Sequence, residues 1–469
     1  MNALLSKIFC AQRVLKNTPP QGEIPDDETL LRRTFRVAWP STLESFLVAL
    51  VGMVDTIMVS RLGAYAIAAV GLTTQPKFIC LAVFMSLNIA VSALVARRKG
   101  EGDREGANRV LAQSMVLTVM FAIVITAIAI LFAEPILRLT GSNAETHESA
   151  AAYFRIISAG MIFNVMSMVI NAAQRGAGNT KIAMRTNLVS NGVNIVFNYL
   201  LIEGHFGFPR LGVAGAAVAT VIGTMVALAM SVLSVAHPEG FLYLQFQKKR
   251  FRLERSTLAT IANIGSSSLA EQLFLRFGFL TYAMIVARLG TTAFAAHQVG
   301  MNVITISFAF GDGLSVASVA LVGQSLGEKR GDLARIYLSF CQRVGLFCSL
   351  TLAVVYSVVS RDVFRLFSSE EEILVYGEMI MRMVALIVIM QVAQVISSGC
   401  LRGAGDTKYV AIVSLVSVAC IRPLAGYVFT YPLGMGLFGA WIGLVLDQFM
   451  RLILTSIRVR SGKWLNIRI

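Results

Sequence analysis

Two stretches of this chain, 110–133 and 211–236, contain no Asp, Glu, Lys or Arg. Each reaches the length, about twenty residues, of an α-helix that crosses the hydrocarbon core of a bilayer. Hydrophobic residues form 56% of the chain and charged residues only 14%, a balance that excludes an ordinary soluble domain. The sequence therefore predicts an all-α polytopic membrane protein.

Further apolar segments bring the number of predicted spans to twelve. They are expected at 37–60, 66–96, 110–133, 151–174, 183–203, 211–236, 258–287, 293–325, 334–359, 376–400, 409–430 and 437–458. Clusters of Lys and Arg occupy both terminal segments and every second loop, whereas the alternate loops carry one or two cations at most. Because cytoplasmic loops are enriched in Lys and Arg, both termini are expected in the cytoplasm.

The net charge of +15 does not indicate a nucleic-acid partner, because the cations lie in short loops between apolar segments and not on one basic face. The expected partner of these loops is the lipid bilayer. The six cysteines are scattered and the four histidines are dispersed, so neither a disulfide framework nor a metal site is predicted.

The chain contains an internal duplication. R-G-A-G-N-T-K at 175–181 recurs as R-G-A-G-D-T-K at 402–408, and Glu44 recurs as Glu271. The differences 402 − 175 and 271 − 44 both equal 227, and two further motifs keep that offset. Late in the chain the offset falls to 224, which places a short deletion in the second half. Each half has six predicted spans, so the halves enter the membrane in the same direction as parallel repeats.

The predicted organisation therefore has two six-helix lobes. The parts are a cytoplasmic N-terminal tail at 1–36 that is expected to be flexible up to Glu28, an N-terminal lobe at 37–236, a cytoplasmic linker at 237–257, a C-terminal lobe at 258–458 and a cytoplasmic tail at 459–469. Two lobes of this kind suit alternating access, with the substrate path between them. A duplication alone does not exclude a pore or a membrane-embedded enzyme.

Four motifs carry a family resemblance that covers nearly the whole chain. They are V-D-T-I-M-V-S-R-L-G at 54–63, the repeated R-G-A-G-[ND]-T-K, N-I-V-F-N-Y-L-L-I at 194–202, and G-V-A-G-A-A-V-A-T at 212–220. Together they resemble multidrug and toxic compound extrusion (MATE) transporters. The resemblance implies a twelve-helix, two-lobed antiporter of the bacterial inner membrane. Arg422-Pro423 and Asp447 are more similar to the DinF-like branch than to the NorM-like branch.

Four polar residues are expected to meet in the outer half of the N-terminal lobe. Asp55 precedes Arg61 by six residues and Asn198 precedes the end of its span by five, which places both roughly 8–9 Å inside the outer boundary. Asn194 lies one turn from Asn198 on the same helix face. The next span starts outside near Leu211, so Thr220 falls within a turn or two of the same depth. One carboxylate with amide and hydroxyl oxygens suits a small hard cation or a protonation switch.

The family resemblance implies that these same residues form a cation-coupling site. Some members carry Asp where this chain has Asn198, so a single acid remains. The lower charge favours H⁺ as the coupling ion over Na⁺ at Asp55. The alternative is that the asparagines simply join transmembrane helices to one another.

Further side chains are candidates for the substrate path. Glu44 lies in the inner half of the first span, and Glu271 is its repeat partner, so the pair either lines an inward-facing vestibule for cations or holds neighbouring helices. Tyr282 is the uncharged repeat partner of Asp55, which predicts asymmetric coupling between the lobes. NorM-like relatives carry acids where this chain has Leu275 and Gln391, so a cation site of that type is not expected in the second lobe.

Two features have structural interpretations beside the functional ones. Arg422 and Asp447 lie at similar depth on successive spans, so they are expected to form an ion pair that holds the second lobe together or takes part in transport. Pro40 either occupies the first turn of the first span or marks a bend in it.

The function predicted from these features is export of small organic, drug-like molecules in exchange for H⁺ or Na⁺, by a protein that works as a monomer. No Walker A motif is present, so ATP is not expected as the direct energy source. A flippase for lipid-linked precursors is the alternative within the same fold. An enzyme is not expected, because no His/Asp or Ser/His constellation is visible, and a passive channel is disfavoured.

Overall fold

The computed structural model describes residues 9–15, 19–143, 145–244, 254–365 and 371–467. Within these ranges the chain is helical and has no strand. The long helices are α3 (Asp27–Ser60), α4 (Ala64–Gly100), α5 (Arg104–Leu131), α7 (His147–Ala159), α8 (Met161–Gly176), α9 (Thr180–Glu203), α10 (Gly212–Ser234), α11 (Arg255–Ala287), α12 (Thr291–Gly327), α13 (Gly331–Val358), α15 (Glu371–Gly403), α16 (Thr407–Ser414), the π-helix η2 (Leu415–Ile421), α17 (Arg422–Thr430) and α18 (Gly436–Ser461). Short helices are α2 (Ala11–Val14), α6 (Ala133–Leu139), η1 (His205–Gly207), α14 (Ser360–Arg365) and η3 (Lys463–Asn466).

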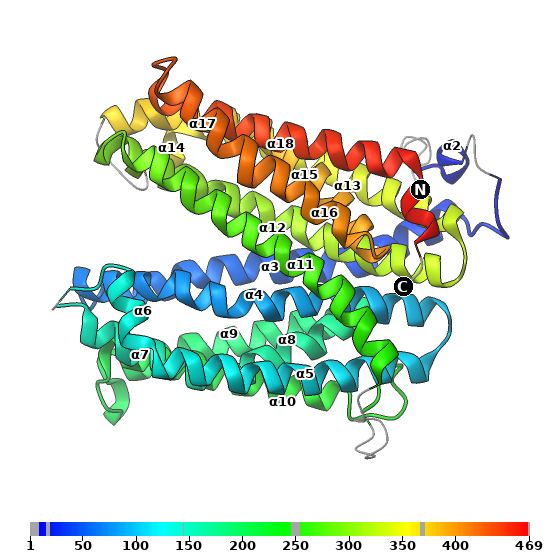
Figure 1. The fold of residues 1–469 in the computed structure, drawn as a ribbon, viewed down its shortest axis with the longest axis horizontal. Helices are drawn as coiled ribbons and strands as arrows, with labels where there is room; N and C mark the ends of the chain where they lie inside the picture. The colour runs from blue at the N-terminus through cyan, green and yellow to red at the C-terminus, as the bar shows by residue number, and fades with distance from the viewer. Residues whose placement is uncertain (1–8, 16–18, 144, 245–253, 366–370, 468–469) are drawn as a thin grey trace. The chain divides into compact units, whose positions relative to one another are not determined.

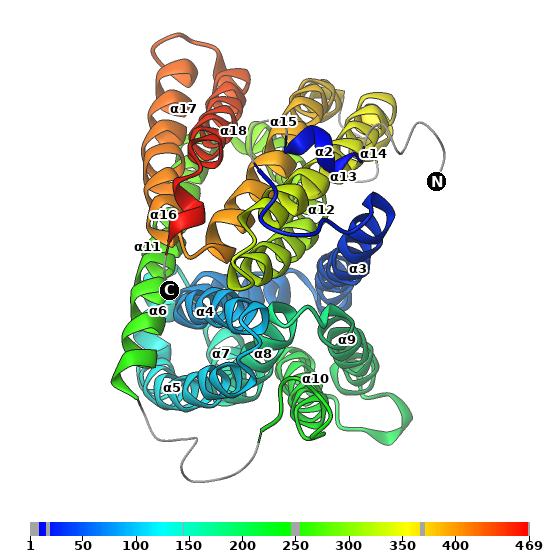
Figure 2. The same ribbon diagram turned by 90° about the vertical axis from the view of Figure 1, so that its right-hand side faces the viewer.

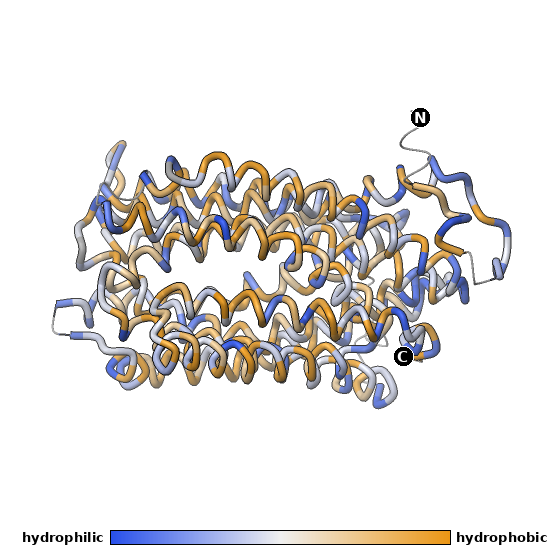
Figure 3. Tube along the Cα trace, turned by 90° about the horizontal axis from the view of Figure 1, so that it is seen from above, coloured by the Kyte–Doolittle hydropathy of each residue, from blue (hydrophilic) through white to orange (hydrophobic). Residues whose placement is uncertain are grey.

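The predicted twelve-span fold is confirmed. Ten helices or continuous helical segments of the described chain are long and apolar enough to cross a membrane, and the bent pair α7 and α8 makes an eleventh span. The twelfth is α9, which has the length of a span but is less apolar because it carries several asparagines. Figure 3 shows hydrophobic residues along the middle of the helices and hydrophilic residues gathered toward their ends.

The duplicated motif folds into the same tight turn in both halves. Gly178 and Gly405 adopt positive φ values of 82° and 87°, which favour glycine. The backbone nitrogens of Asn179 and Asp406 bond the carbonyls of Gln174 and Leu401, so the hydrogen bonds themselves repeat. The glycines therefore lie in a tight turn between two helices in both halves.

The helices form two compact units, an N-terminal unit of residues 46–265 and a C-terminal unit of residues 1–45 and 266–469. These units divide α3 and α11 internally, whereas the lobe boundaries predicted from the repeat lie at the ends of spans. Residues 1–8 and 16–18 of the predicted tail, and 245–253 of the predicted linker with its basic run, lie outside the described residues.

In the N-terminal unit, α8 lies at the centre, surrounded by α4, α5, α7, α9 and α10 (Figure 2). Close approach between α9 and α10 depends on two glycines. A Cβ on Gly215 would lie 2.4 Å from the carbonyl oxygen of Leu201, and one on Gly223 would lie 2.9 Å from that of Ser190. The missing side chains therefore allow the backbones of α9 and α10 to touch.

In the C-terminal unit, α15 packs against α12, α13 and α18, and α17 lies beside α18 (Figure 1). A glycine again permits close contact between α12 and α15, because a Cβ on Gly399 would lie 2.6 Å from the carbonyl oxygen of Ser315. The inner part of α3 belongs to this unit, where Leu30, Val37 and Ala38 join its hydrophobic core.

The prediction of a flexible N-terminal tail is wrong for its described residues. Phe9, Ala11 and Leu15 are buried in the hydrophobic core of the C-terminal unit, and the ring of Phe9 meets Phe340 edge-on at 5.4 Å. The backbone nitrogen of Gln21 donates to Asp332 at 3.0 Å. The apolar residues of the tail thus pack on the hydrophobic core of the C-terminal unit.

Candidate functional site

Asp55, Asn194, Asn198 and Thr220 lie in direct contact within the N-terminal unit. The side-chain nitrogen of Asn198 donates to Asp55 Oδ1 at 2.8 Å and to Asn194 Oδ1 at 3.2 Å. The side-chain amide of Asn194 lies 3.2 Å from Thr220 Oγ1, whose hydroxyl also donates to the carbonyl of Ala216 at 2.9 Å. Counting residues from the helix ends therefore identified side chains that α3, α9 and α10 bring together.

The amide of Asn194 satisfies its neighbours better when its oxygen and nitrogen exchange places. Its nitrogen then donates to Asp55 Oδ1 at 2.8 Å, and its oxygen accepts from the nitrogen and the hydroxyl of Thr220 at 3.2 Å. Two amide nitrogens consequently point toward one carboxylate oxygen. The oxygen of Asn198 is buried and has no partner among the described residues.

Two residues beside this site were missed from the sequence. Lys77 in α4 interacts electrostatically with Asp55, and so does Tyr153 in α7. Lys77 lines a cavity of about 30 Å³ together with Asn164 and Thr220. The signal that identifies Lys77 is an ionisable residue inside an apolar span, which usually marks a functional position.

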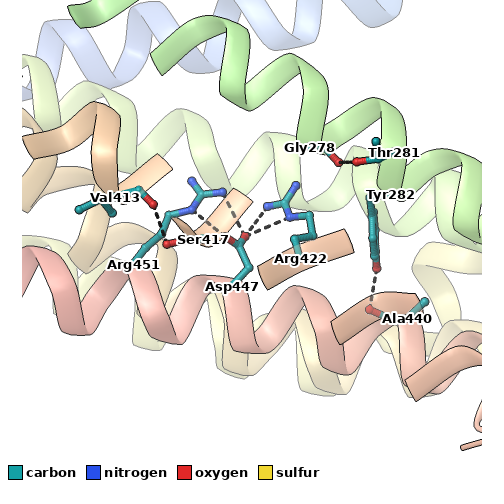
Figure 4. Close-up of polar contacts among 9 residues, drawn as sticks. All are labelled: Gly278, Thr281, Tyr282, Val413, Ser417, Arg422, Ala440, Asp447 and Arg451. Atoms are coloured by element: carbon teal, nitrogen blue, oxygen red, sulfur yellow. Dashed lines mark hydrogen bonds and ion pairs between the residues drawn. The ribbon is translucent and has the colours of Figure 1, made fainter. Parts of the chain in front are cut away.

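The repeat counterpart of Asp55 lies in a different environment. Tyr282 is 1% exposed and belongs to a hydrophobic core cluster of the C-terminal unit. Its hydroxyl donates to the carbonyl of Ala440 at 2.9 Å (Figure 4). Gln391 is also buried, at 4% exposed. The assignment of Tyr282 and Gln391 to the substrate path stays a prediction.

Arg422 and Asp447 form a buried ion pair in the C-terminal unit. The Nε and Nη2 atoms of Arg422 donate to Asp447 Oδ2 at 3.1 and 2.5 Å. Arg451, which the sequence analysis missed, donates to both oxygens of Asp447 at 3.0 and 3.1 Å (Figure 4). Two guanidinium groups thus share one carboxylate, and their role in stability or transport stays a prediction.

Local structure explains how Arg422 reaches this position. The π-helix η2 widens the turns just before Arg422, and Pro423, the second residue of α17, has no backbone donor to satisfy. The guanidinium of Arg422 also lies over the ring of Phe279, with 4.7 Å between the guanidinium carbon and the ring centroid. A cation–π contact of this kind helps to stabilise a charge away from water.

Glu271 pairs with Arg402 in the C-terminal unit, and its side chain is 2% exposed. This contact corresponds to the alternative in which the acid holds a neighbouring helix, here α15. Glu44 is buried, at 8% exposed, and the next residue, Ser45, donates to Asp312 at 3.1 Å. A vestibule lined by Glu44 and Glu271 stays a prediction.

The suggestion that Pro40 occupies the first turn of a helix is wrong. Pro40 lies inside α3, which begins at Asp27. The reason is that charged residues such as Arg32 and Arg33 extend the helix beyond the apolar segment from which the span was predicted. A bend at Pro40 remains a prediction, since an interior proline removes one backbone hydrogen bond.

Among the described residues, no three His, Cys, Asp or Glu side chains lie together so that they could hold a metal ion. The neighbours of Asp55 make the site a single carboxylate with amide and hydroxyl groups beside it. Such a group can exchange a proton or a monovalent cation as its surroundings change.

Comparison with known proteins places these features in a family. The MatE family model matches residues 40–200 and again 268–428, in agreement with the duplication. The chain is 28% identical to the "Probable multidrug resistance protein NorM" of Thermotoga maritima, over 96% of each chain. It is 26% identical to the "Uncharacterized transporter YisQ" of Bacillus subtilis, over 97% of this chain and 99% of that protein.

A solved structure has the same fold. An outward-facing multidrug resistance MATE family transporter of the MOP superfamily aligns with a TM-score of 0.86 and 22% identity, over 94% of this chain and 100% of that one. The resemblance to the DinF-like branch rests on Arg422, Pro423 and Asp447 and stays a prediction. The two family-model matches together cover more than half of the sequence. The chain therefore belongs to the MatE family, the MATE transporters that its motifs resemble.

Proposed function

We propose that this protein exports small organic, drug-like molecules from the cytoplasm, driven by a cation that enters the cell through the N-terminal unit. The names of its relatives support the substrate class, since the Thermotoga maritima and Yersinia enterocolitica proteins are both named as multidrug resistance proteins. Positive charge in alternate loops supports an inner-membrane location with both termini cytoplasmic. We further propose that the protein functions as a monomer.

The observation that carries the proposal is the setting of Asp55. It is an acid inside a membrane-spanning helix, held by the amide of Asn198 and adjacent to an unpartnered amide oxygen. An intramembrane acid is costly and usually marks an ion or proton pathway. Gain and loss of a cation at this carboxylate can alter which helices it holds together.

The donor set favours H⁺ over Na⁺ as the coupling ion. A hard metal cation needs several oxygen ligands, yet with Asn194 in its better-satisfied orientation two amide nitrogens face Asp55 Oδ1. The unpartnered oxygen of Asn198 and the second carboxylate oxygen leave few ligands for a metal ion. A proton needs only the carboxylate itself.

Transport by inside-out vesicles tests this proposal. Wild-type and Asp55→Asn vesicles are given a fluorescent cationic dye while a pH gradient and a Na⁺ gradient are imposed separately. We expect uptake by the wild type with the pH gradient only, and none above background by Asp55→Asn. Equal uptake by the two proteins would refute the role of Asp55, and uptake driven only by Na⁺ would refute the choice of ion.

A further inference from the structure

Lys77 lies inside α4 and has no counter-ion in contact with it. Lys77 makes no hydrogen bond or ion pair with the described residues, and the one aromatic ring near its ammonium is that of the adjacent Phe78, 6.0 Å away. It directly follows Pro76, which lies within the helix and cannot donate a backbone hydrogen bond. A lone ammonium in a membrane-spanning helix is costly, so a partner is expected for at least part of the transport cycle.

The space next to Lys77 leads to the cation site. Lys77, Asn164, Thr220 and Thr224 line one cavity of about 30 Å³, and Thr220 bonds to Asn194 in the site itself. A cavity of that size has room for one or two water molecules. Lys77 and Asp55 interact electrostatically but do not form an ion pair within 4.0 Å. A movement of the Lys77 ammonium toward Thr220, across this small and mostly apolar space, would bring it nearer to the cation site.

The internal repeat supports a link between the two charges. Counting 227 residues onward, Asp55 corresponds to Tyr282 and Lys77 corresponds to Ile304. The C-terminal unit therefore lacks both the acid and the ammonium at these positions, and both replacements belong to one hydrophobic cluster. Pro76 is likewise replaced, by Val303. The two charges occur together in one repeat and are absent together from the other.

We infer that Lys77 is a built-in competitor for the coupling cation: its ammonium pairs with Asp55 when the cation leaves, and is displaced when the cation returns. This inference rests on the proposed function of Asp55. Pro76 provides the place where α4 can bend to bring Lys77 across the cavity. After the cation leaves, the carboxylate of Asp55 is negatively charged, and pairing with Lys77 keeps that charge from being isolated. The pairing also speeds release of the cation on the cytoplasmic side.

Among the residues that the structure describes, the groups that face Asp55 come from four helices, and only one of them carries a positive charge. They are Lys77 from α4, Tyr153 from α7, Asn194 and Asn198 from α9, and Thr220 from α10. Removing the charge of Lys77 therefore removes the one competing cation near the carboxylate. Because unit charges a few ångströms apart interact strongly in a medium of low dielectric, the change in cation affinity is expected to be roughly tenfold or more.

The test compares Lys77→Gln with Lys77→Arg in vesicles. For Lys77→Gln we expect the half-maximal export rate at a proton concentration roughly tenfold lower than in the wild type, with a lower maximal rate because release is slower. Lys77→Arg keeps the charge and should restore both values toward the wild type. An unchanged half-maximal concentration in Lys77→Gln, or Lys77→Arg behaving like Lys77→Gln, would overturn the inference.

Two further variants separate this inference from the proposed function. Asp55→Asn without loss of export would refute the function itself, whatever Lys77 does. If Asp55→Asn is inactive but Lys77→Gln keeps the wild-type proton dependence, only the competitor role fails. Thermal unfolding of purified Lys77→Gln should match the wild type; a correctly folded variant that lacks the expected shift refutes the inference.

Discussion

The cation site of the N-terminal unit and the corresponding place in the C-terminal unit differ in chemistry although they arise from one repeated sequence. In the N-terminal unit the place is polar and ionisable. In the C-terminal unit the four side chains that correspond to Asp55, Lys77, Tyr153 and Thr220 belong to one buried hydrophobic cluster. At the offsets of the repeat, Asp55, Lys77, Tyr153 and Thr220 correspond to Tyr282, Ile304, Ile380 and Leu444. Only one lobe therefore retains an acid at this place.

The scaffold beneath the two places is nevertheless the same. Thr220 donates to the carbonyl of Ala216 at 2.9 Å, and Tyr282 donates to the carbonyl of Ala440 at 2.9 Å. Ala440 follows Ala216 by 224 residues, which is the offset of the late part of the repeat. The corresponding carbonyl oxygen therefore accepts a hydrogen bond from a hydroxyl group in each unit. In the N-terminal unit the hydroxyl comes from the same helix, α10, and in the C-terminal unit it comes from another helix, α11. Divergence therefore changed the side chains of the site and kept the helices.

The largest effect is expected from replacing the acid itself. Asp55→Asn keeps the size of the side chain but removes its charge, so gradient-driven export should fall to background because no cation binds. Its matched variant, Tyr282→Phe, removes one hydrogen bond from the corresponding place and should keep more than half of the export rate. Dye uptake by vesicles measures both. Equal losses in the two variants would contradict the asymmetry between the lobes.

Asp447→Asn, in the second lobe, is expected to lower the stability of the protein by a large amount. It should not specifically uncouple export from the cation gradient. This change leaves Arg422 and Arg451 without their shared anion. Breaking a buried pair costs about 3–5 kcal/mol of unfolding free energy. Thermal unfolding in detergent measures the loss.

Glu134→Gln is the control for Asp447→Asn, because it breaks an exposed pair with Arg155 at 2.8 Å. That pair should contribute less than about 1 kcal/mol. If Asp447→Asn unfolds at the wild-type temperature yet loses export, then the charge cluster takes part in transport.

The contrast between the lobes shows which parts of the molecule were accessible from sequence. Span positions and the convergence of Asp55, Asn194, Asn198 and Thr220 followed from apolar length and a fixed rise per residue, which are local properties. Lys77 and Arg451 were missed because cations were counted mainly in loops, where they report orientation; within the spans Arg422 was considered and these two were not.

Contacts that depend on tertiary packing could not be predicted by counting residues along the helices. Arg402 was counted as a loop cation of the repeated motif, yet its side chain reaches back to Glu271. The burial of Phe9 and Leu15 depends on a surface formed by residues far along the chain. No periodicity within the tail itself indicates that surface.

An intermediate effect is expected from separating α9 and α10. In Gly223→Ala the new methyl group would lie 2.9 Å from the carbonyl oxygen of Ser190 and 3.2 Å from Asn194 Cβ. Overpacking of this kind costs about 1–3 kcal/mol, and the shift of Asn194 should lower export several-fold. Gly192→Ala on α9 is the control, because nothing lies within 4 Å of its added methyl group. Wild-type export by Gly223→Ala would show that the site tolerates a wider helix spacing.

The smallest effect is expected from Thr220→Val, which keeps the shape of the side chain and removes its hydroxyl. Hydrogen bonds between transmembrane helices contribute about 0.6 kcal/mol on average, so the proton concentration for half-maximal export should change by about threefold or less. Thr118→Val is the control, since the hydroxyl of Thr118 bonds its own helix at Ser114, as that of Thr220 bonds Ala216.

The size of the Thr220→Val effect also separates two models of the site. If Thr220 only orients Asn194, the maximal export rate stays near the wild-type value and Thr118→Val has no effect on the proton dependence. If Thr220→Val abolished export as completely as Asp55→Asn, the hydroxyl itself would be a ligand of the cation. That result would favour a metal ion over a proton, because a proton on Asp55 needs no second oxygen ligand.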